Sequence, residues 1–182
     1  IQRKEKTLWV DYAVLYRTNA QSRSLEEALR RKNIPYKIYG GLSFYSRKEI
    51  KDVLAYCRLC INPDDEEAIK RIINYPARGI GNTTMQKLII TADNLNLSIW
   101  DILINIEKYD LKINNGTKQR LEDFTQLINS FIITKDKYDA YELVEKIIKN
   151  SGIYHDLFSD KSIEGINRFE NVQELLNGIK DF

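Results

Sequence analysis

The chain has 182 residues, of which 43% are hydrophobic and 30% charged, and its formal net charge is +2. This length and composition suit one or two compact domains with a buried core. The weak positive charge excludes a uniformly basic surface, so any contact with a polyanion has to come from local patches. No apolar run in the sequence is long enough to cross a membrane, and we expect a cytoplasmic protein.

The N-terminal part has the pattern of a βαβ unit. Residues 9–15 form an apolar and β-branched run interrupted only by Asp11, long enough for a buried strand and too short for a helix. Strands buried on both faces are typical of parallel sheets. A helix capped by Thr18 or Asn19 follows, and residues 36–39 form a second short strand. We therefore predict an α/β fold for this part of the chain.

Tyr16 and Arg17 come directly after the first predicted strand. Open α/β sheets bind their ligands at the carboxyl ends of strands, so this position favours a nucleotide contact. The alternative is that Arg17 is an ordinary surface charge, as most arginines near strand ends are.

After residue 47 the chain is predicted to be mostly helical. In residues 47–59, apolar residues recur every three or four positions and charged residues lie between them, which is the pattern of an amphipathic helix. The acids of residues 64–67 follow Asn62 and Pro63, so we interpret them as the first turn of a helix rather than a metal site. The other helices are expected at residues 66–73, from about 83, at 117–131 and at 140–150.

A glycine turn at residues 76–82 joins two of these helices. Glycines allow backbone N–H groups to approach phosphate, and the next helix presents its positive end, so such a turn is suited to holding a DNA backbone. The alternative is a connection between helices that binds no ligand. The residues predicted to contact DNA here are Arg78, Gly79, Ile80, Gly81 and Lys87.

Two further features have simpler interpretations. Phe44 and Tyr45, in the loop of residues 40–47, could stack on DNA bases, but we favour their packing in the core. Cys57 and Cys60 have no second cysteine pair or histidine cluster beside them, so we interpret them as packing thiols and predict no metal site.

Three segments occur in an order that resembles a known family. They are AVLYRTNAQSR (13–23), IPYKIYGGLSFYSRKEIKDVLAYCRL (34–59) and INPDDEEAIKRIINYPARGIG (61–81). Together they resemble the region from motif IV onward of the UvrD, PcrA and Rep family of superfamily-one DNA helicases. The resemblance is strong over residues 11–81 and fainter up to residue 182.

The resemblance implies an ATP-driven motor that moves 3′ to 5′ on single-stranded DNA and unwinds duplex ahead of it. It implies that Tyr16 stacks on adenine and that Arg17 reaches the γ-phosphate as a catalytic residue. Residues 1–110 would be part of the incomplete, P-loop-type RecA-like domain 2A, and residues 111–182 the start of the helical 2B subdomain. In the second part, by location, the DNA-contacting positions are Lys118, Ser151 and Gly152.

The sequence has no GxxxxGK(S/T) phosphate loop and no apolar strand that ends in paired acids. We therefore expect a piece of a larger helicase that neither hydrolyses ATP nor unwinds DNA by itself. ATP and Mg²⁺ would bind in the full-length protein, between this part and domain 1A. The expected partners are single-stranded DNA and its junction with duplex, at the nucleoid. The pathway stays open between DNA repair, replication restart and plasmid copying, and the alternative function is a stand-alone DNA-binding or adaptor module without a motor.

Overall fold

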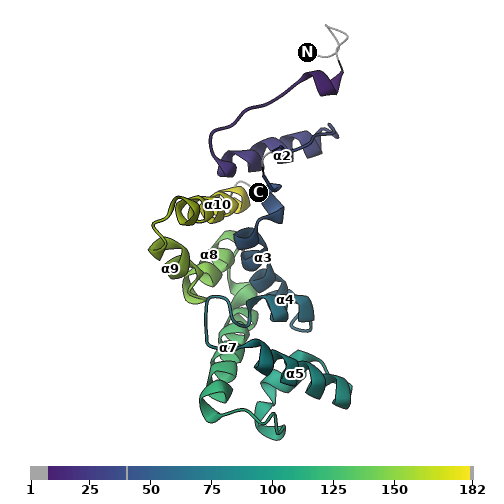
Figure 1. Ribbon diagram of the computed structural model, residues 1–182, viewed down its shortest axis with the longest axis vertical. Coiled ribbons are helices and arrows are strands. Elements are labelled where there is room, and N and C mark those ends of the chain that lie inside the picture. The colour runs from purple at the N-terminus through teal and green to yellow at the C-terminus, as the bar shows by residue number, and fades with distance from the viewer. Residues whose placement is uncertain (1–7, 40, 181–182) are drawn as a thin grey trace. The chain divides into compact units, whose positions relative to one another are not determined.

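The computed structural model describes residues 8–39 and 41–180, and these residues form helices joined by short turns (Figure 1). The α-helices are α2 (Ser22–Arg31), α3 (Lys48–Ile61), α4 (Glu66–Ile72), α5 (Asn82–Leu95), α6 (Ile99–Ile104), α7 (Asn115–Thr134), α8 (Ala140–Asn150), α9 (Ile153–Ser159) and α10 (Ile163–Lys180). The 3-10 helices are η1 (Trp9–Asp11), η2 (Asn19–Gln21), η3 (Phe44–Ser46), η4 (Ile106–Lys108) and η5 (Lys135–Lys137).

The predicted α/β fold of the N-terminal part, an incomplete RecA-like domain, is wrong. None of the described residues forms a β-strand. The Asp11 carboxylate accepts a hydrogen bond of 2.8 Å from the Leu8 N–H, and the chain turns into η1 where a strand was expected. The following residues are locally extended, but a strand needs a neighbour for its backbone groups, and the described residues provide none. Val14 and Leu15, expected to be buried, are 60% and 95% exposed.

The helices predicted from periodicity are confirmed, with bounds shifted by a few residues. The predicted cap by Thr18 or Asn19 is wrong, because α2 has Gln21 at its N-cap and no side-chain cap. Side chains do cap several of the other helices. Asp65 accepts from the Ala68 N–H at the start of α4, Asn114 from the Thr117 N–H at the start of α7, and Asp139 from the Glu142 N–H at the start of α8. Asp65 is followed by Glu66 and Glu67 in the first turn of α4, which confirms the helical interpretation of this acidic run.

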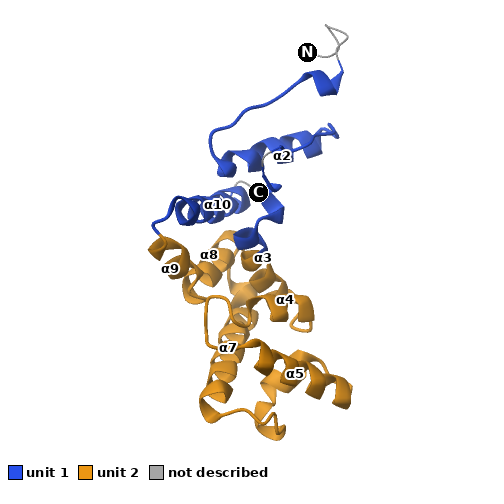
Figure 2. Ribbon diagram, in the orientation of Figure 1, with its two compact units in different colours: residues 1–51, 161–182 blue, residues 52–160 orange. Residues whose placement is uncertain are grey.

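The chain divides into two compact units, coloured separately in Figure 2. One comprises residues 1–51 and 161–182, and the other comprises residues 52–160. The division expected between residues 110 and 111 stays a prediction. Within the described residues, no helix combines the length and the apolar composition that crossing a bilayer requires.

The first unit is held together by buried charges. Arg23 of α2 is 7% exposed, and its guanidinium pairs with Glu27 on the same helix at 3.0 Å and with Glu174 of α10 at 2.9 Å. The buried Glu26 carboxylate accepts a hydrogen bond of 2.9 Å from the Phe44 N–H. Buried charges are tolerated only when they are paired and hydrogen-bonded, so these contacts fix α2 against α10 and η3.

The second unit has a conventional apolar core. Helices α4 to α9 and the later part of α3 each contribute apolar side chains to it, as amphipathic helices do. The core side chains, each at most 1% exposed, include Tyr56, Ile69, Ile72, Leu88, Ile102, Leu103, Phe124, Ile128, Phe131 and Ile147. This core supports the glycine turns described below.

Candidate functional site

Tyr16 and Arg17 lie in the first unit, just before η2. The side-chain oxygen of Gln21 accepts hydrogen bonds from the backbone N–H groups of Arg17 (2.9 Å) and Thr18 (3.2 Å), which fixes the turn into α2. The Arg17 side chain is exposed, and Tyr16 is 36% exposed. The structure therefore keeps both side chains accessible, through local hydrogen bonding and without a sheet.

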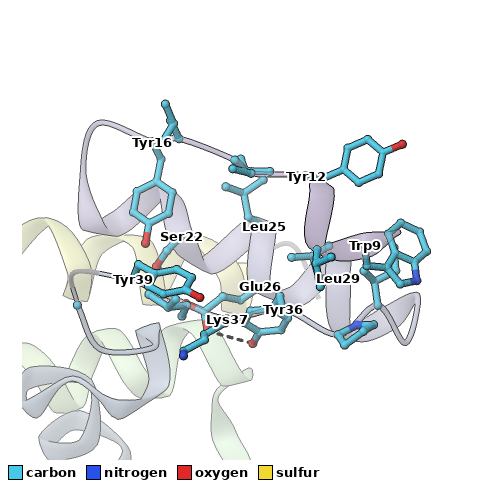
Figure 3. A pocket seen from close by; sticks show the side chains of 18 of the residues that line it. Trp9, Tyr12, Tyr16, Ser22, Leu25, Glu26, Leu29, Tyr36, Lys37 and Tyr39 are labelled. Atoms are coloured by element: carbon cyan, nitrogen blue, oxygen red, sulfur yellow. Dashed lines mark hydrogen bonds between the residues drawn. The ribbon is translucent and has the colours of Figure 1, made fainter. Parts of the chain in front are cut away.

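Tyr16 lines a cavity of about 980 Å³ between α2 and the two extended segments that flank it. Leu25 and Leu29 of α2 line one side, and residues 34–39 line another. Figure 3 shows the Tyr16 ring directed toward the part of the cavity that holds Ser22 and Tyr39. The cavity is mostly apolar and aromatic, with Tyr16 at its edge.

The glycine turn of residues 76–82 lies in the second unit. The Asn74 side-chain oxygen accepts from the N–H groups of Arg78 (2.9 Å) and Ile80 (3.0 Å), and the Ile80 side chain is buried. Gly79 has φ = +72°, a conformation that favours glycine. Within the described residues, no group accepts from the N–H groups of Gly81 and Asn82. The turn is thus anchored on its inner side and leaves N–H donors free at the start of α5.

The Arg78 guanidinium points into the protein. Its Nη1 donates to the carbonyl oxygens of Ile72 (3.1 Å), Tyr75 (2.9 Å) and Pro76 (3.2 Å), and its Nη2 donates to the Tyr56 hydroxyl (2.8 Å) and the Ser151 carbonyl (3.0 Å). The guanidinium carbon lies 5.6 Å from the centre of the Phe124 ring. Arg78 therefore serves as a junction between the glycine turn, α3, α7 and the turn before α9.

The second predicted turn, Ser151 and Gly152, lies beside the first. Gly152 has φ = +89°, and a Cβ atom at this position would lie 3.7 Å from Cγ of Pro76. The Ser151 side chain is buried, and its hydroxyl donates to the Ile148 carbonyl. The structure thus brings together two of the predicted DNA-contacting turns, which are far apart in the sequence.

Lys87 and Lys118 have partners on the protein surface. The Lys87 ammonium donates to the Lys112 carbonyl at 2.5 Å, and the Lys118 ammonium pairs with Glu107 at 2.5 Å. The hydrogen bond from Lys118 lowers the pKa of the Glu107 carboxyl. Exposed pairs of this kind are weak, so both ammonium groups can exchange partners readily.

Sequence reasoning missed two residues at the first glycine turn. Asn74 holds the turn through its side-chain oxygen, and Arg120 of α7 donates to the Gly79 carbonyl at 3.3 Å. An asparagine four residues before Arg78 is a recognisable turn signal. No sequence signal points to Arg120, which comes 41 residues after Gly79.

The predicted packing of Phe44 is confirmed. Phe44 is fully buried, and its ring meets Tyr45 edge to face at 5.2 Å. The Tyr45 hydroxyl donates to Glu27 at 2.7 Å. Gly40, in the same predicted loop, lies outside the described residues.

The cysteines lie on one helix, as predicted, and the buried Cys60 has the packing role expected of it. Its thiol donates to the Tyr56 carbonyl at 3.2 Å. Burial raises the pKa of the Cys57 thiol to about 12 and that of Cys60 to about 11, so both stay protonated near neutral pH. Among residues 8–39 and 41–180, no three histidine, cysteine or acidic side chains are grouped so that they could hold a metal ion.

Among known protein families, the class that the sequence matches is a C-terminal domain of helicases. Over residues 1–182 the chain matches the family described as the UvrD-like helicase C-terminal domain, and it belongs to this family. This confirms the resemblance found in the sequence.

The chain is similar to proteins named ATP-dependent DNA helicase PcrA. It is 40% identical over 172 residues to the one from Bacillus subtilis (strain 168), and 38% identical over 172 residues to those from Staphylococcus epidermidis (strain RP62A) and Staphylococcus aureus (strain Mu50). Each match covers 94% of this chain and 23% of the relative. The chain thus spans about a quarter of the length of these curated relatives.

Proposed function

We propose that this chain is a part of an ATP-dependent DNA helicase, in which it supplies one side of the nucleotide site and a surface that holds the DNA backbone. Membership of the UvrD-like C-terminal family supports this, as do the names of the relatives. The single observation that carries the DNA-binding part is the pair of adjacent glycine turns, Arg78–Gly81 and Ser151–Gly152, in the second unit.

The nucleotide role rests on Tyr16 and Arg17. An accessible aromatic ring beside an exposed guanidinium fits the base and the phosphate end of a nucleotide. In this proposal ATP, when bound, supplies the phosphoryl group whose hydrolysis drives movement on DNA. Tyr16 gives the adenine a flat face, and Arg17 stabilises negative charge at the transferring phosphate. The phosphate loop and the Mg²⁺ ligands come from domain 1A of the full-length protein, since this sequence has no GxxxxGK(S/T) motif.

The DNA role rests on backbone donors at the first glycine turn, because the N–H groups of Ser151 and Gly152 donate to the carbonyls of Ile147 and Lys149. The free N–H groups of Gly81 and Asn82 open α5, where the helix dipole favours an anion. Lys87 and Lys118 add positive charge that can leave its weak surface pairs for phosphate. Such contacts do not depend on base sequence, as a motor moving along DNA requires.

The proposed substrate is single-stranded DNA at its junction with duplex, and the proposed direction is 3′ to 5′. The isolated 182 residues are expected neither to hydrolyse ATP nor to unwind DNA. The cytoplasmic, nucleoid-associated location follows from the DNA substrate and is part of the same proposal. The test is strand separation of a duplex with a 3′ or a 5′ tail by the protein at its full natural length. ATP-dependent separation of the 3′-tailed duplex supports the proposal. Tight DNA binding without ATP hydrolysis would instead indicate an adaptor module.

A further inference from the structure

The first glycine turn would hold phosphate more firmly with a positively charged side chain beside it that faces solvent. Arg78 is the basic residue inside the turn. Its guanidinium donates hydrogen bonds to four backbone carbonyls and to the Tyr56 hydroxyl. Its ring contacts with Phe124 and Tyr56 keep it facing inward. A phosphate could reach this guanidinium only if the hydrogen bonds that join the two glycine turns, such as the one from Arg78 to the Ser151 carbonyl, were broken.

Arg120 is placed differently. It lies near the start of α7 on an exposed position, and its Nη1 donates to the Gly79 carbonyl at 3.3 Å. A Cβ atom at Gly79 would come within 3.0 Å of that Nη1 and 3.3 Å of the guanidinium carbon. The guanidinium therefore lies against the face of Gly79 where any other residue would have its side chain.

The remaining donors of Arg120 are available. Within the described residues, the Gly79 carbonyl is the one group that accepts from Arg120, and no carboxylate pairs with it. On the same helix, Lys118 pairs with Glu107, and Asp123 accepts a hydrogen bond from Gln119. A guanidinium presents five N–H donors in a fork that matches phosphate oxygens.

We propose that Arg120 contacts a DNA phosphate at the Gly79–Gly81 turn, and that Arg78 acts as a positioning residue that holds this turn against Ser151. The inference rests on the proposed DNA-binding function and names a further side chain that adds positive charge at the turn. Arg120 and the free N–H groups of Gly81 and Asn82 approach the same phosphate backbone. A glycine is needed at position 79 because the Arg120 guanidinium lies where a side chain would be.

The experiment measures DNA affinity of the full-natural-length protein without nucleotide, at several salt concentrations. The probes are a blunt duplex and a single strand of unrelated sequence, since either can bring phosphate to the turn. The variant Arg120→Gln is expected to bind at least one probe about tenfold more weakly at low salt. The negative slope of log affinity against log salt should become shallower by about 0.9, the value for one lost phosphate contact on duplex DNA. The probe that is affected identifies whether duplex or single strand lies at the turn.

Lys137→Gln is the matched control, because it removes one exposed charge just beyond the opposite end of α7. It is expected to bind both probes as the wild type does. Arg120→Lys should retain the salt slope but regain only part of the affinity, because an ammonium cannot form the same fork. If Arg120→Gln binds both probes like Lys137→Gln, the role of Arg120 is overturned while the proposed function stands. A wild type whose affinity does not depend on salt overturns both.

Discussion

The Nη2 group of Arg78 donates a hydrogen bond of 3.0 Å to the carbonyl oxygen of Ser151, a residue 73 positions later in the chain. This bond joins the turn before α5 to the turn before α9. The two glycine turns, which are far apart in the sequence, therefore lie side by side and form one surface. The same guanidinium also holds the Tyr56 hydroxyl, so this surface is fixed to the core of the second unit.

Replacing Arg78 is expected to destabilise the second unit. Arg78→Gln leaves several part-buried carbonyls and the Tyr56 hydroxyl without their donor, which should lower the free energy of unfolding by about 2–4 kcal/mol. Arg78→Lys should recover little of this, since one ammonium cannot replace the fork. Urea unfolding followed by the fluorescence of the buried Trp100, in a Trp9→Phe background, measures the loss. An unchanged unfolding midpoint in Arg78→Gln would show that these bonds do not stabilise the unit.

The two glycines of the first turn should respond differently to alanine. Gly79→Ala forces φ = +72° on an alanine and pushes against Arg120, so we expect a loss of about 1–2 kcal/mol in unfolding free energy. Gly81→Ala is the control, because Gly81 has φ = −85° and no described atom lies within 4 Å of the added Cβ. Its stability should fall by less than that of Gly79→Ala in the same urea experiment, because the expected cost is only that of alanine as a poorer N-cap of α5. Equal losses in both variants would contradict this account of the turn.

Arg17→Ala should reduce ATP turnover of the full-natural-length protein by about 10³-fold or more, the size expected for an arginine that stabilises a transferring phosphoryl group. Folding should be unaffected, because the Arg17 side chain is exposed and its backbone N–H keeps the bond to Gln21. Arg31→Ala, also exposed and at the end of α2, is the matched control. Steady-state ATPase assays with and without single-stranded DNA measure the effect. Normal ATP turnover in Arg17→Ala would show that Arg17 is not a catalytic residue.

The stability of the second unit should fall at alkaline pH. Burial raises the folded-state pKa of Cys57 and Tyr56 to about 12 and that of Cys60 to about 11, from ordinary values of 9.0 for the thiols and 10.0 for the phenol. A group whose pKa is higher in the folded state than in the unfolded state makes its full contribution to stability below the unfolded-state pKa. This contribution to the free energy of unfolding is lost as the pH rises toward the folded-state pKa. We therefore expect stability to be constant below about pH 8 and to decline above pH 9, by up to about 1.4 kcal/mol per pH unit for each group.

The control for this pH dependence is the double variant Cys57→Ala, Cys60→Ala. It should be less stable at pH 7 but lose less stability between pH 9 and pH 11 than the wild type. Urea midpoints at these pH values, read from Trp100, provide the measurement. The same slope in both proteins would show that the thiols are not the titrating groups.

The sequence predicted the local features well. The helices over residues 48–61, 66–72 and 140–150 follow from apolar spacing and from caps such as Asp139, which depend only on nearby residues. The predicted sheet failed because pairing is not local. Residues 9–15 have strand composition, but Asp11 turns the first of them into η1 and no described neighbour pairs with the rest.

The candidate site was predictable in part for the same reason. The glycine turns were visible as short motifs, and the structure brings them together. The direction of the Arg78 side chain depends on Tyr56 and Ser151, and the guanidinium at Gly79 comes from Arg120. These contacts join residues 22, 73 and 41 positions apart, which no spacing rule in one sequence reveals.

The most direct test of the central claim compares the affinity of the wild type and of Gly81→Val for a duplex with a 3′ single-stranded tail, at two salt concentrations. The account predicts salt-dependent, sequence-independent binding by the wild type. It predicts weaker binding by Gly81→Val in a protein that still folds, because the valine side chain shields the free N–H groups at the start of α5. As valine is a poorer N-cap than glycine, the variant should lose about 1 kcal/mol in unfolding free energy. Equal affinity of the two proteins, with Gly81→Val correctly folded, would contradict the claim that this turn holds DNA.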